Sequence, residues 1–191
     1  MQLDNIYTLK NGGVGIAPAD TIYGIFASAL NPKVIEHLYD VVKGRDKTKP
    51  FIILISKFED LEIFNIKIND KVSNFLKKVW PGKVSVVLEC NDEKFTYLHR
   101  GKRSLAFRVP DRADLVETLS KTGPLVSTSA NLEGEPTITT IDEAKKIFGD
   151  KVDFYEDGGE IISVPSTIVT ISNDELKIIR MGASSEIPKS L

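Results

Sequence analysis

The sequence contains very few of the residues that build disulfides and zinc centres. Its 191 residues include one cysteine, Cys90, and two histidines, His37 and His99. A single cysteine cannot close an internal disulfide, and this set of sulfur and imidazole ligands is too small for a Cys/His zinc cluster. We therefore expect no protein-held metal centre, and we interpret Cys90 as a small apolar residue packed at a strand end rather than as a nucleophile.

Long apolar runs and glycine-rich phosphate loops are also missing. No stretch approaches the length needed to cross a bilayer, and the N-terminal region, with Asp4 and no sustained apolar core, does not have the pattern of a signal peptide. No Gly-x-x-x-x-Gly-Lys-Ser/Thr segment occurs, which argues against a P-loop kinase or NTPase. We therefore expect a cytoplasmic protein with no membrane contact.

The formal net charge of −2 conceals an uneven distribution of charge along the chain. Residues 41–112 contain 16 Lys and Arg against 9 Asp and Glu, whereas the remaining residues contain 9 against 18. A basic middle region suits phosphates or a nucleic-acid backbone, although a solvated lysine-rich face would have the same composition. The basic residues form two groups in the sequence: Lys43, Arg45, Lys47 and Lys49, and then Arg100, Lys102, Arg103, Arg108 and Arg112.

Apolar spacing predicts helices and strands that alternate along the chain, which is typical of an α/β fold around one largely buried sheet. Helices are expected from Asn31, with Pro32 in the first turn, from 69 to 79, after a cap at Asp111, and from a capping box of Thr140 and Glu143 to Gly149. Strands are expected at residues 14–17, 51–55, 84–88, 105–109, from 125 onward, 152–155, 167–171 and 176–179, with a loop carrying Asp20, Thr21 and Tyr23 after the first.

The length and the apolar content of 41% are sufficient for one sizeable core, and nothing in the sequence demands a second domain. We expect a single domain over residues 1–191, with its core at about 5–182. The serine-rich segment 183–191 is expected to be loosely ordered.

The segment 124–136 ends a short apolar stretch in small polar residues. Ser127, Thr128, Ser129 and Asn131 bring hydroxyls and an amide to the place where an α/β sheet commonly opens into a ligand crevice. The same residue types are also ordinary in turns and helix caps. Two further segments, 18–24 and 43–45, likewise place small or basic residues beside strand-like runs.

Together with segments 80–88, 104–110, 165–169 and 178–182, these motifs resemble the YrdC-like family of threonylcarbamoyl-adenylate synthases, in its short single-domain branch. The resemblance covers most of the chain and implies a YrdC-type twisted mixed β-sheet flanked by helices, with a concave basic face. It also implies formation of threonylcarbamoyl-AMP and pyrophosphate from L-threonine, bicarbonate or CO2, and ATP. This nucleotidyl transfer would serve the threonylcarbamoyladenosine modification of tRNA.

On this resemblance, Lys43, Arg45, Ser129 and Asn131 form a catalytic set that contacts the phosphates of ATP. An arginine can bind phosphate with two parallel hydrogen bonds, whereas a lysine acts as a mobile point charge. The basic pair could instead be an ordinary helix C-terminus that favours positive charge. Mg²⁺ would arrive with ATP and needs no dedicated carboxylate cage. The resemblance adds three further residues on the nucleotide side: Ser104, Thr137 and Arg180.

For the amino acid, the resemblance implies contacts from Thr21, Arg108, Thr128 and Ser166. Arg108 lies in a strand pattern that otherwise looks buried, so it should face an anion or a cleft, or form a structural ion pair with Asp or Glu. The hydroxyls could instead cap backbone groups. The family pattern is broken at four positions: Ala19 replaces a small hydroxyl residue, Phe26 a glycine, and Lys49 and Leu54 the Asn and His of longer members.

Two alternative functions remain open from the sequence: a non-catalytic module that binds double-stranded RNA or tRNA, and a carbamoyl-transfer domain. Few aromatic residues are interleaved with the basic segments, which favours the enzyme over the RNA-binding module. A short synthase would need partner proteins of the tRNA modification pathway and could contact tRNA itself. No histidine or carboxylate is placed to be nominated as general base.

Overall fold

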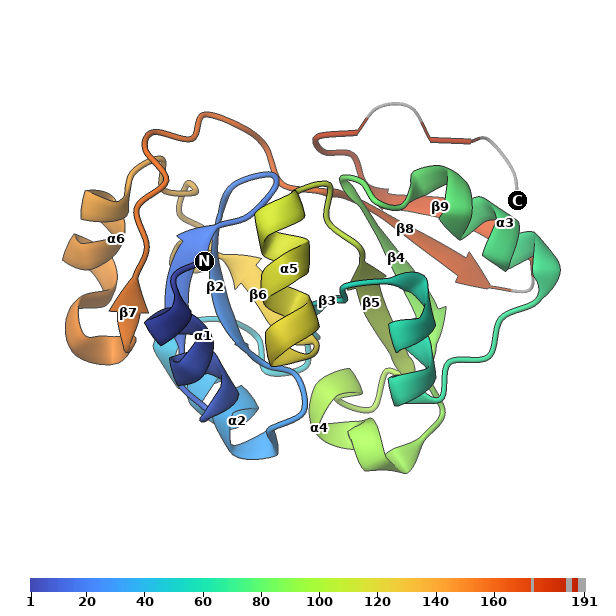
Figure 1. Cartoon of the computed structure of the whole chain (residues 1–191). Helices are drawn as coiled ribbons and strands as arrows, with labels where there is room; N and C mark the ends of the chain where they lie inside the picture. The colour runs from blue at the N-terminus through green and yellow to red at the C-terminus, as the bar shows by residue number, and fades with distance from the viewer. Residues whose placement is uncertain (173, 185–186, 189–191) are drawn as a thin grey trace.

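The computed structural model describes residues 1–172, 174–184 and 187–188. These residues form a nine-stranded mixed sheet with the strand order β7-β1-β2-β6-β3-β5-β4-β8-β9, and helices pack against this sheet (Figure 1). The strands are β1 Gly15–Pro18, β2 Tyr23–Ser28, β3 Ile52–Leu54, β4 Val84–Glu89, β5 Ser104–Arg108, β6 Leu125–Ser129, β7 Phe154–Tyr155, β8 Thr167–Ser172 and β9 Glu175–Arg180. The expectation for the tail falls partly on residues 185–186 and 189–191, which lie outside the described residues.

Parallel and antiparallel pairs are mixed in this sheet, which confirms the predicted fold class. β3 runs parallel to β5 and β4 parallel to β8, while β2 pairs antiparallel with β6 and β6 antiparallel with β3. The sheet therefore brings together segments that are far apart in the sequence, such as residues 23–28 and 125–129. The concave basic face expected from the resemblance stays a prediction.

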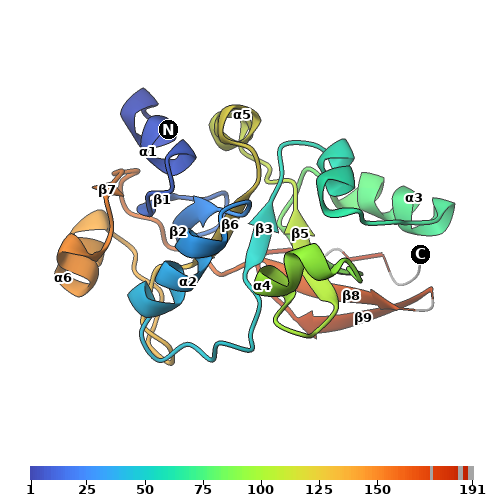
Figure 2. The same ribbon diagram turned by 90° about the horizontal axis from the view of Figure 1, so that it is seen from below.

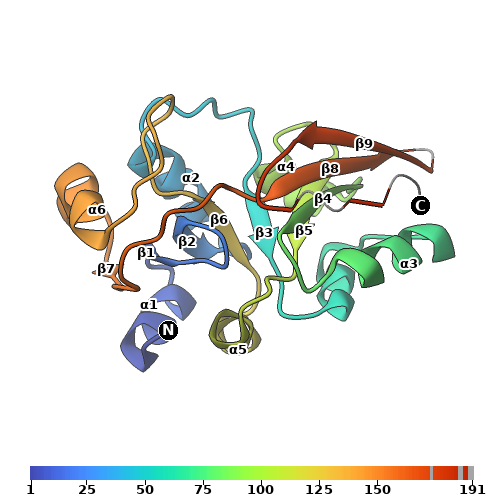
Figure 3. The same cartoon turned by 90° about the horizontal axis from the view of Figure 1, so that it is seen from above.

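The helices cover both faces of the sheet, as the views from below and above show (Figures 2 and 3). They are α1 Leu3–Lys10, α2 Pro32–Val41, α3 Asp70–Val79, α4 Thr96–His99, α5 Ala113–Thr122 and α6 Ile141–Phe148, with short 3-10 turns at Phe58–Phe64, Glu93–Phe95 and Gly149–Lys151. In both views α1, α5 and α3 lie on one side of the sheet and α2 on the other, while Figure 1 shows α4 below the end of β5. Among the described residues, no helix is both long enough and apolar enough to span a membrane.

Most predicted helix starts are confirmed by their capping hydrogen bonds. The Asn31 side chain accepts from the backbone amides at the start of α2, and Asn69 caps α3 in the same way. Thr140 caps α6 by accepting from the Glu143 amide, but the Glu143 carboxylate accepts from the amide of Thr139 rather than from that of Thr140. The capping box is therefore displaced by one residue on that side.

The predicted cap at Asp111 is wrong. Helix α5 begins at Ala113 with Arg112 as its N-cap residue, which makes no side-chain capping bond. Asp111 instead donates its backbone amide to the carboxylate of Asp20, 91 residues earlier in the chain. Asp111 therefore takes part in a tertiary contact through its backbone, and it is not the N-cap residue of α5.

Helices α1 and α4 and strand β2 were not predicted, and β6 is longer than expected. The loop expected around Tyr23 is short, because β2 begins at Tyr23 and runs to Ser28. Likewise Ser127 and Ser129 belong to β6 itself and not to a loop after it, since β6 pairs with β2 on one side and with β3 on the other. These neighbours extend the strand through residues whose local preference is for turns.

Cys90 is buried, with its thiol directed at the carbonyl of Phe64, in agreement with a packing role.

Candidate active site

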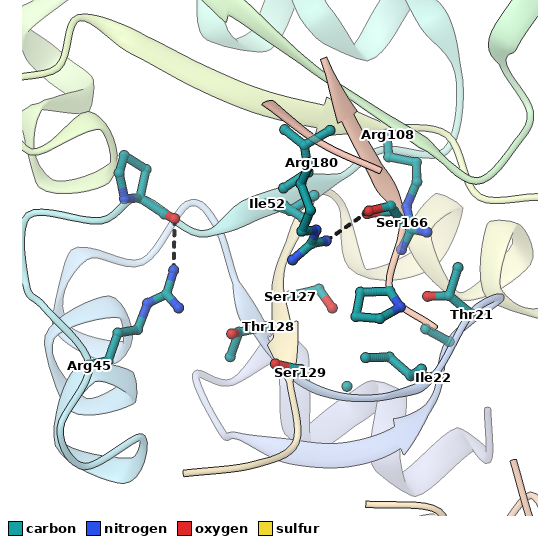
Figure 4. A pocket seen from close by; sticks show the side chains of 15 residues that line it. Thr21, Ile22, Arg45, Ile52, Arg108, Ser127, Thr128, Ser129, Ser166 and Arg180 are labelled. Carbon is teal, nitrogen blue, oxygen red and sulfur yellow. Dashed lines mark hydrogen bonds between the residues drawn. The ribbon is translucent and has the colours of Figure 1, made fainter. Parts of the chain in front are cut away.

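A cavity of about 160 Å³, called here the inner cavity, lies where the turn between β1 and β2 meets the ends of β5 and β6 and the start of β8 (Figure 4). All four residues predicted to bind the amino acid line it: Thr21, Arg108, Thr128 and Ser166. Figure 4 shows Thr21, Arg108 and Ser166 at one side of the cavity and Arg45 at the opposite side. The sheet order brings these residues together from four separate segments of the chain.

The turn that carries Thr21 is closed by its own backbone, because the amide of Ala19 donates to the carbonyl of Ile22 at 3.0 Å. Strand β2 then runs beside β6, with Gly24 opposite Ser129. A Cβ atom at Gly24 would lie 3.0 Å from the Ser127 hydroxyl oxygen, so glycine allows a close approach of the two strands at the cavity wall. Phe26, where the family more often has glycine, is fully buried.

Arg108 forms a buried ion pair behind the cavity wall. Its Nη1 lies 2.9 Å from Oδ1 of Asp20, and the two side chains are 4% and 1% exposed. Burial lowers the pKa of Arg108, the charge of Asp20 opposes this effect, and the charge of Arg180 adds to it. The structural ion pair that the sequence left open is therefore present, yet Arg108 also lines the inner cavity. One guanidinium thus has both a buried partner and access to the cavity.

Two hydroxyls and a second arginine complete this end of the site. The Ser166 hydroxyl lies 2.9 Å from that of Ser85, and both side chains are buried. Arg180 donates to the backbone carbonyl of Ser166 at 2.8 Å, and burial lowers the pKa of Arg180. Ser85 was missed by sequence reasoning, although a serine within the apolar run of β4 was a usable signal for a buried polar contact.

A larger cavity of about 720 Å³, called here the outer cavity, adjoins the inner one. The two share the side chains of Arg45, Pro50, Ile52, Ser129, Ile168 and Arg180. The outer cavity adds polar groups that include Lys49, Lys102, Ser104, Asn131 and Glu133, and apolar groups that include Val87, Ala106 and Ile179. Ser129 and Arg180 therefore stand at the junction of a small polar cavity and a larger one.

Two residues of the predicted ATP set are held by backbone carbonyls. The Arg45 guanidinium donates to the carbonyls of Pro50 at 2.9 Å and Lys49 at 3.4 Å, lies 4.6 Å from the Phe51 ring centre, and has its pKa lowered by burial. The Asn131 amide nitrogen donates to two carbonyls of its own loop, while its buried Oδ1 has no hydrogen-bond partner among the described residues. That oxygen is available to an incoming donor or cation.

Two other predicted residues lie outside both cavities. Lys43 is exposed on the turn that follows α2 and is not among the lining residues of either cavity. Thr137 lines a separate shallow cavity beside Ile138 and Glu143. The structure therefore gathers nine of the eleven predicted residues around the two joined cavities, and the roles of Lys43 and Thr137 stay predictions.

The rim of the outer cavity carries an exposed ion pair. Lys49 Nζ lies 2.9 Å from Glu133 Oε1, and the side chains are 56% and 40% exposed. Glu133 is the single carboxylate among the described residues that line the outer cavity. Within the described part of the chain, no group of three or more His, Cys, Asp or Glu residues could hold a metal ion.

The comparison with protein families gives a match that covers most of the chain. The model of the Sua5/YciO/YrdC family, described as "Telomere recombination", matches residues 7–182. This chain belongs to the Sua5/YciO/YrdC family. The single-domain organisation expected from the sequence stays a prediction.

Proteins with the name threonylcarbamoyl-AMP synthase match nearly the whole chain. A Methanocaldococcus jannaschii protein, provisionally named a threonylcarbamoyl-AMP synthase, is 34% identical over 175 residues, which are 91% of this chain and 82% of that protein. The Bacillus subtilis threonylcarbamoyl-AMP synthase is 28% identical over 91% of this chain and 51% of its own. The structure of Pyrococcus abyssi Sua5 complexed with L-threonine superimposes with a TM-score of 0.86 at 27% identity, over 94% of this chain and 53% of the other. This chain therefore spans about half the length of the last two relatives.

Proposed function

We propose that this protein is a threonylcarbamoyl-AMP synthase, which joins L-threonine, bicarbonate or CO2, and ATP and releases pyrophosphate. A carbamate oxygen of N-carboxylated threonine would attack the α-phosphorus of ATP, which makes the enzyme a nucleotidyltransferase. The observation that carries this proposal is the small cationic cavity that opens at Ser129 and Arg180 into a larger one. The synthase names of relatives and the threonine complex of Pyrococcus abyssi Sua5 support the same activity.

The inner cavity suits a small amino acid. Arg108 and Arg180 supply positive charge for a carboxylate and a carbamate, and Thr21, Thr128 and Ser166 supply short hydroxyl groups. A site that holds both reactants in a fixed geometry removes the need for a productive collision in solution. This positioning can supply a large part of the rate enhancement even where the protein holds no metal ion of its own. We therefore assign threonine and its carbamate to this cavity.

The outer cavity suits the nucleotide, because its size falls within the range of sites for drug-sized ligands. Its apolar side chains, among them Val87 and Ile179, offer contact area for a base, while Ser104, Ser129 and Arg180 offer hydrogen bonds to ribose or phosphate. The α-phosphorus would then lie at the junction, next to the inner cavity. We therefore assign ATP to the outer cavity.

Mg²⁺ is expected to enter with ATP. The site residues fit this ion, because the unpartnered Oδ1 of Asn131 and the hydroxyl of Ser129 are hard oxygen donors of the kind that Mg²⁺ accepts beside phosphate oxygens and water. When bound, the ion would neutralise phosphate charge.

A cytoplasmic location, direct contact with tRNA, and partner proteins of the modification pathway stay predictions.

The proposal is tested by measuring pyrophosphate release from ATP, Mg²⁺ and bicarbonate, with L-threonine, with L-serine, or without an amino acid, and by detecting the adenylate by mass. We expect release that depends on threonine and yields the threonylcarbamoyl adenylate. Ser129→Ala should reduce turnover at least about 100-fold because it removes a group at the reacting junction, whereas Ser120→Ala, exposed on α5, should not. A folded protein that makes no adenylate, but binds double-stranded RNA, would favour the RNA-binding alternative instead.

A further inference from the structure

Asp20 is a buried carboxylate for which the reaction has so far no use. Its side chain is 1% exposed, its Oδ1 contacts Arg108, and its Oδ2 accepts the Asp111 amide at 3.3 Å. Asp20 itself does not line the inner cavity, whereas both Arg108 and the adjacent Thr21 do. The carboxylate therefore touches the back of the cavity wall and not the space in which a ligand would lie.

The turn that contains Asp20 is joined by three contacts to the last residue of β5 and to the segment that follows β5. In addition to the two contacts of the Asp20 carboxylate, Arg112 donates to the carbonyl of Ala19 at 3.2 Å. The turn is also closed internally by the bond from Ala19 to Ile22. Displacement of Asp20 would therefore move Thr21, in the turn between β1 and β2, relative to Arg108 in β5.

We propose that Asp20 is a positioning residue for the amino-acid substrate: it holds the Arg108 guanidinium and the Thr21 turn in the geometry that receives the substrate carboxylate. This inference rests on the proposed function. A carboxylate is bound best by a guanidinium whose orientation is already set, because a loose side chain loses part of the interaction to ordering. The 2.9 Å contact between Arg108 Nη1 and Asp20 Oδ1 is a charge–charge contact without hydrogen-bond geometry, and it places the guanidinium beside its counter-charge before the ligand arrives.

The charges around the inner cavity explain why the restraint has to come from behind the wall. Arg45, Arg108 and Arg180 line the cavity, and no carboxylate is found among the described lining residues. A carboxylate inside the cavity would compete with the substrate for Arg108. Asp20 provides the counter-charge that a buried arginine requires and leaves the cavity itself cationic.

The test compares Asp20→Asn with Asp20→Glu and with a matched control, Asp60→Asn. The Asp60 carboxylate accepts hydrogen bonds from the backbone amide and the hydroxyl of Ser56, and Asp60 lines neither cavity. L-Threonine binding is measured by calorimetry, the KM values for threonine and ATP by pyrophosphate release, and folding by circular dichroism and thermal melting.

We expect Asp20→Asn to raise the Kd and KM for threonine at least tenfold and to leave the KM for ATP within about twofold, because ATP is assigned to the other cavity. Asp20→Glu, which keeps the charge at a changed distance, should raise the threonine values at least threefold. Asp60→Asn should change neither the threonine constants nor the KM for ATP. If Asp20→Asn does not fold, the Asp20→Glu variant decides the question on the same readouts.

The inference is overturned if a folded variant binds threonine as the wild type does, or if the threonine and ATP constants worsen equally, as a purely structural defect would cause. The proposed function fails separately if the wild type binds threonine but forms no adenylate. Absence of threonine binding by the wild type overturns both.

Discussion

The inner and outer cavities differ in how their charged groups are held. In the inner cavity, Arg108 is paired with Asp20 where both side chains are almost completely buried. At the rim of the outer cavity, Lys49 and Glu133 form a pair of the same length, but about half of each side chain is exposed. Breaking a buried pair leaves an uncompensated charge and typically costs about 3–5 kcal/mol, whereas an exposed pair contributes about 0–1 kcal/mol.

The supporting elements differ in the same direction. Thr128 and Arg108 lie within strands of the sheet, and Thr21 lies in a short closed turn. Arg45, Lys49, Asn131 and Glu133 lie in the connections between elements. A rigid inner cavity suits discrimination among small amino acids, and a rim made of loops suits the entry of a larger, flexible nucleotide. The following predictions test this contrast, beginning with the largest effect.

Arg108→Met should have the largest effect, since it leaves the Asp20 carboxylate buried without its partner. We expect the free energy of unfolding to fall by about 3–5 kcal/mol and threonine-dependent turnover to be lost. Urea denaturation and pyrophosphate release measure the two quantities. The matched control is Arg103→Met, because Arg103 pairs with Glu93 where both side chains are exposed, and it should change stability by less than about 1 kcal/mol. Equal losses in the two variants would contradict the contrast between the cavities.

Gly24→Ala should narrow the inner cavity. The added Cβ would lie 3.0 Å from the Ser127 hydroxyl and 3.2 Å from the Phe26 ring, at a position that lines the cavity. We expect the KM for threonine to rise about tenfold, within the range that one methyl group can produce in a closely fitting pocket. The KM for the smaller L-serine, measured in parallel as the internal control, should rise less. If the ratio of the KM for threonine to the KM for serine is the same in the variant and the wild type, the inner cavity does not select the amino acid.

Tyr23→Phe should loosen the connection between β7 and β8, which ends at Ser166 in the inner cavity. The Tyr23 hydroxyl donates to the carbonyl of Gly159 at 2.7 Å and accepts from the amide of Gly158 at 2.9 Å. Loss of these bonds should reduce the free energy of unfolding by about 1–2 kcal/mol.

The loss of stability in Tyr23→Phe should depend on pH. Burial raises the pKa of Tyr23, so the folded state keeps its phenolic proton at a pH where the unfolded chain loses it. The stabilisation is therefore complete below pH of about 10 and declines as pH rises through the raised pKa. The difference in unfolding free energy between wild type and Tyr23→Phe, measured in urea from pH 7 to 11, should be constant at first and then shrink. A difference that grows above pH 10 would contradict this assignment.

The exposed pair on the outer rim should give the smallest effect. Glu133→Gln removes negative charge near the place assigned to a polyanion and should lower the KM for ATP, and Lys49→Ala should raise it, each by no more than about threefold. High salt should reduce both effects because it screens exposed charges. Asp40→Asn is the control, because Asp40 and Lys47 form an exposed pair away from both cavities. A change of tenfold or more would show that the rim is as strongly coupled to the site as the inner wall.

Features that depend on neighbours in the sequence were predicted well. The caps at Asn31, Asn69 and Thr140 satisfy amides two or three residues further on, so residue type and spacing suffice to identify them. The apolar runs of β3 and β4 were likewise sufficient to identify strands. The motif pattern identified the family and nine residues that line the cavities, because those residues occur in short recognisable segments.

Features that depend on distant segments were decided only by the tertiary structure. The sequence alone could not show that Asp20 is the partner of Arg108, or that the Asp111 amide donates to Asp20 while Asp111 does not cap α5. It also could not show that Lys43 lies outside both cavities. The physical reason is that the two contacts of Asp20 follow from the order of strands in the sheet, which brings together residues that are far apart in the sequence, such as Asp20 and Asp111, 91 positions apart. Local preference determined the elements of this protein, whereas strand pairing and burial determined which of its charged groups meet at the site.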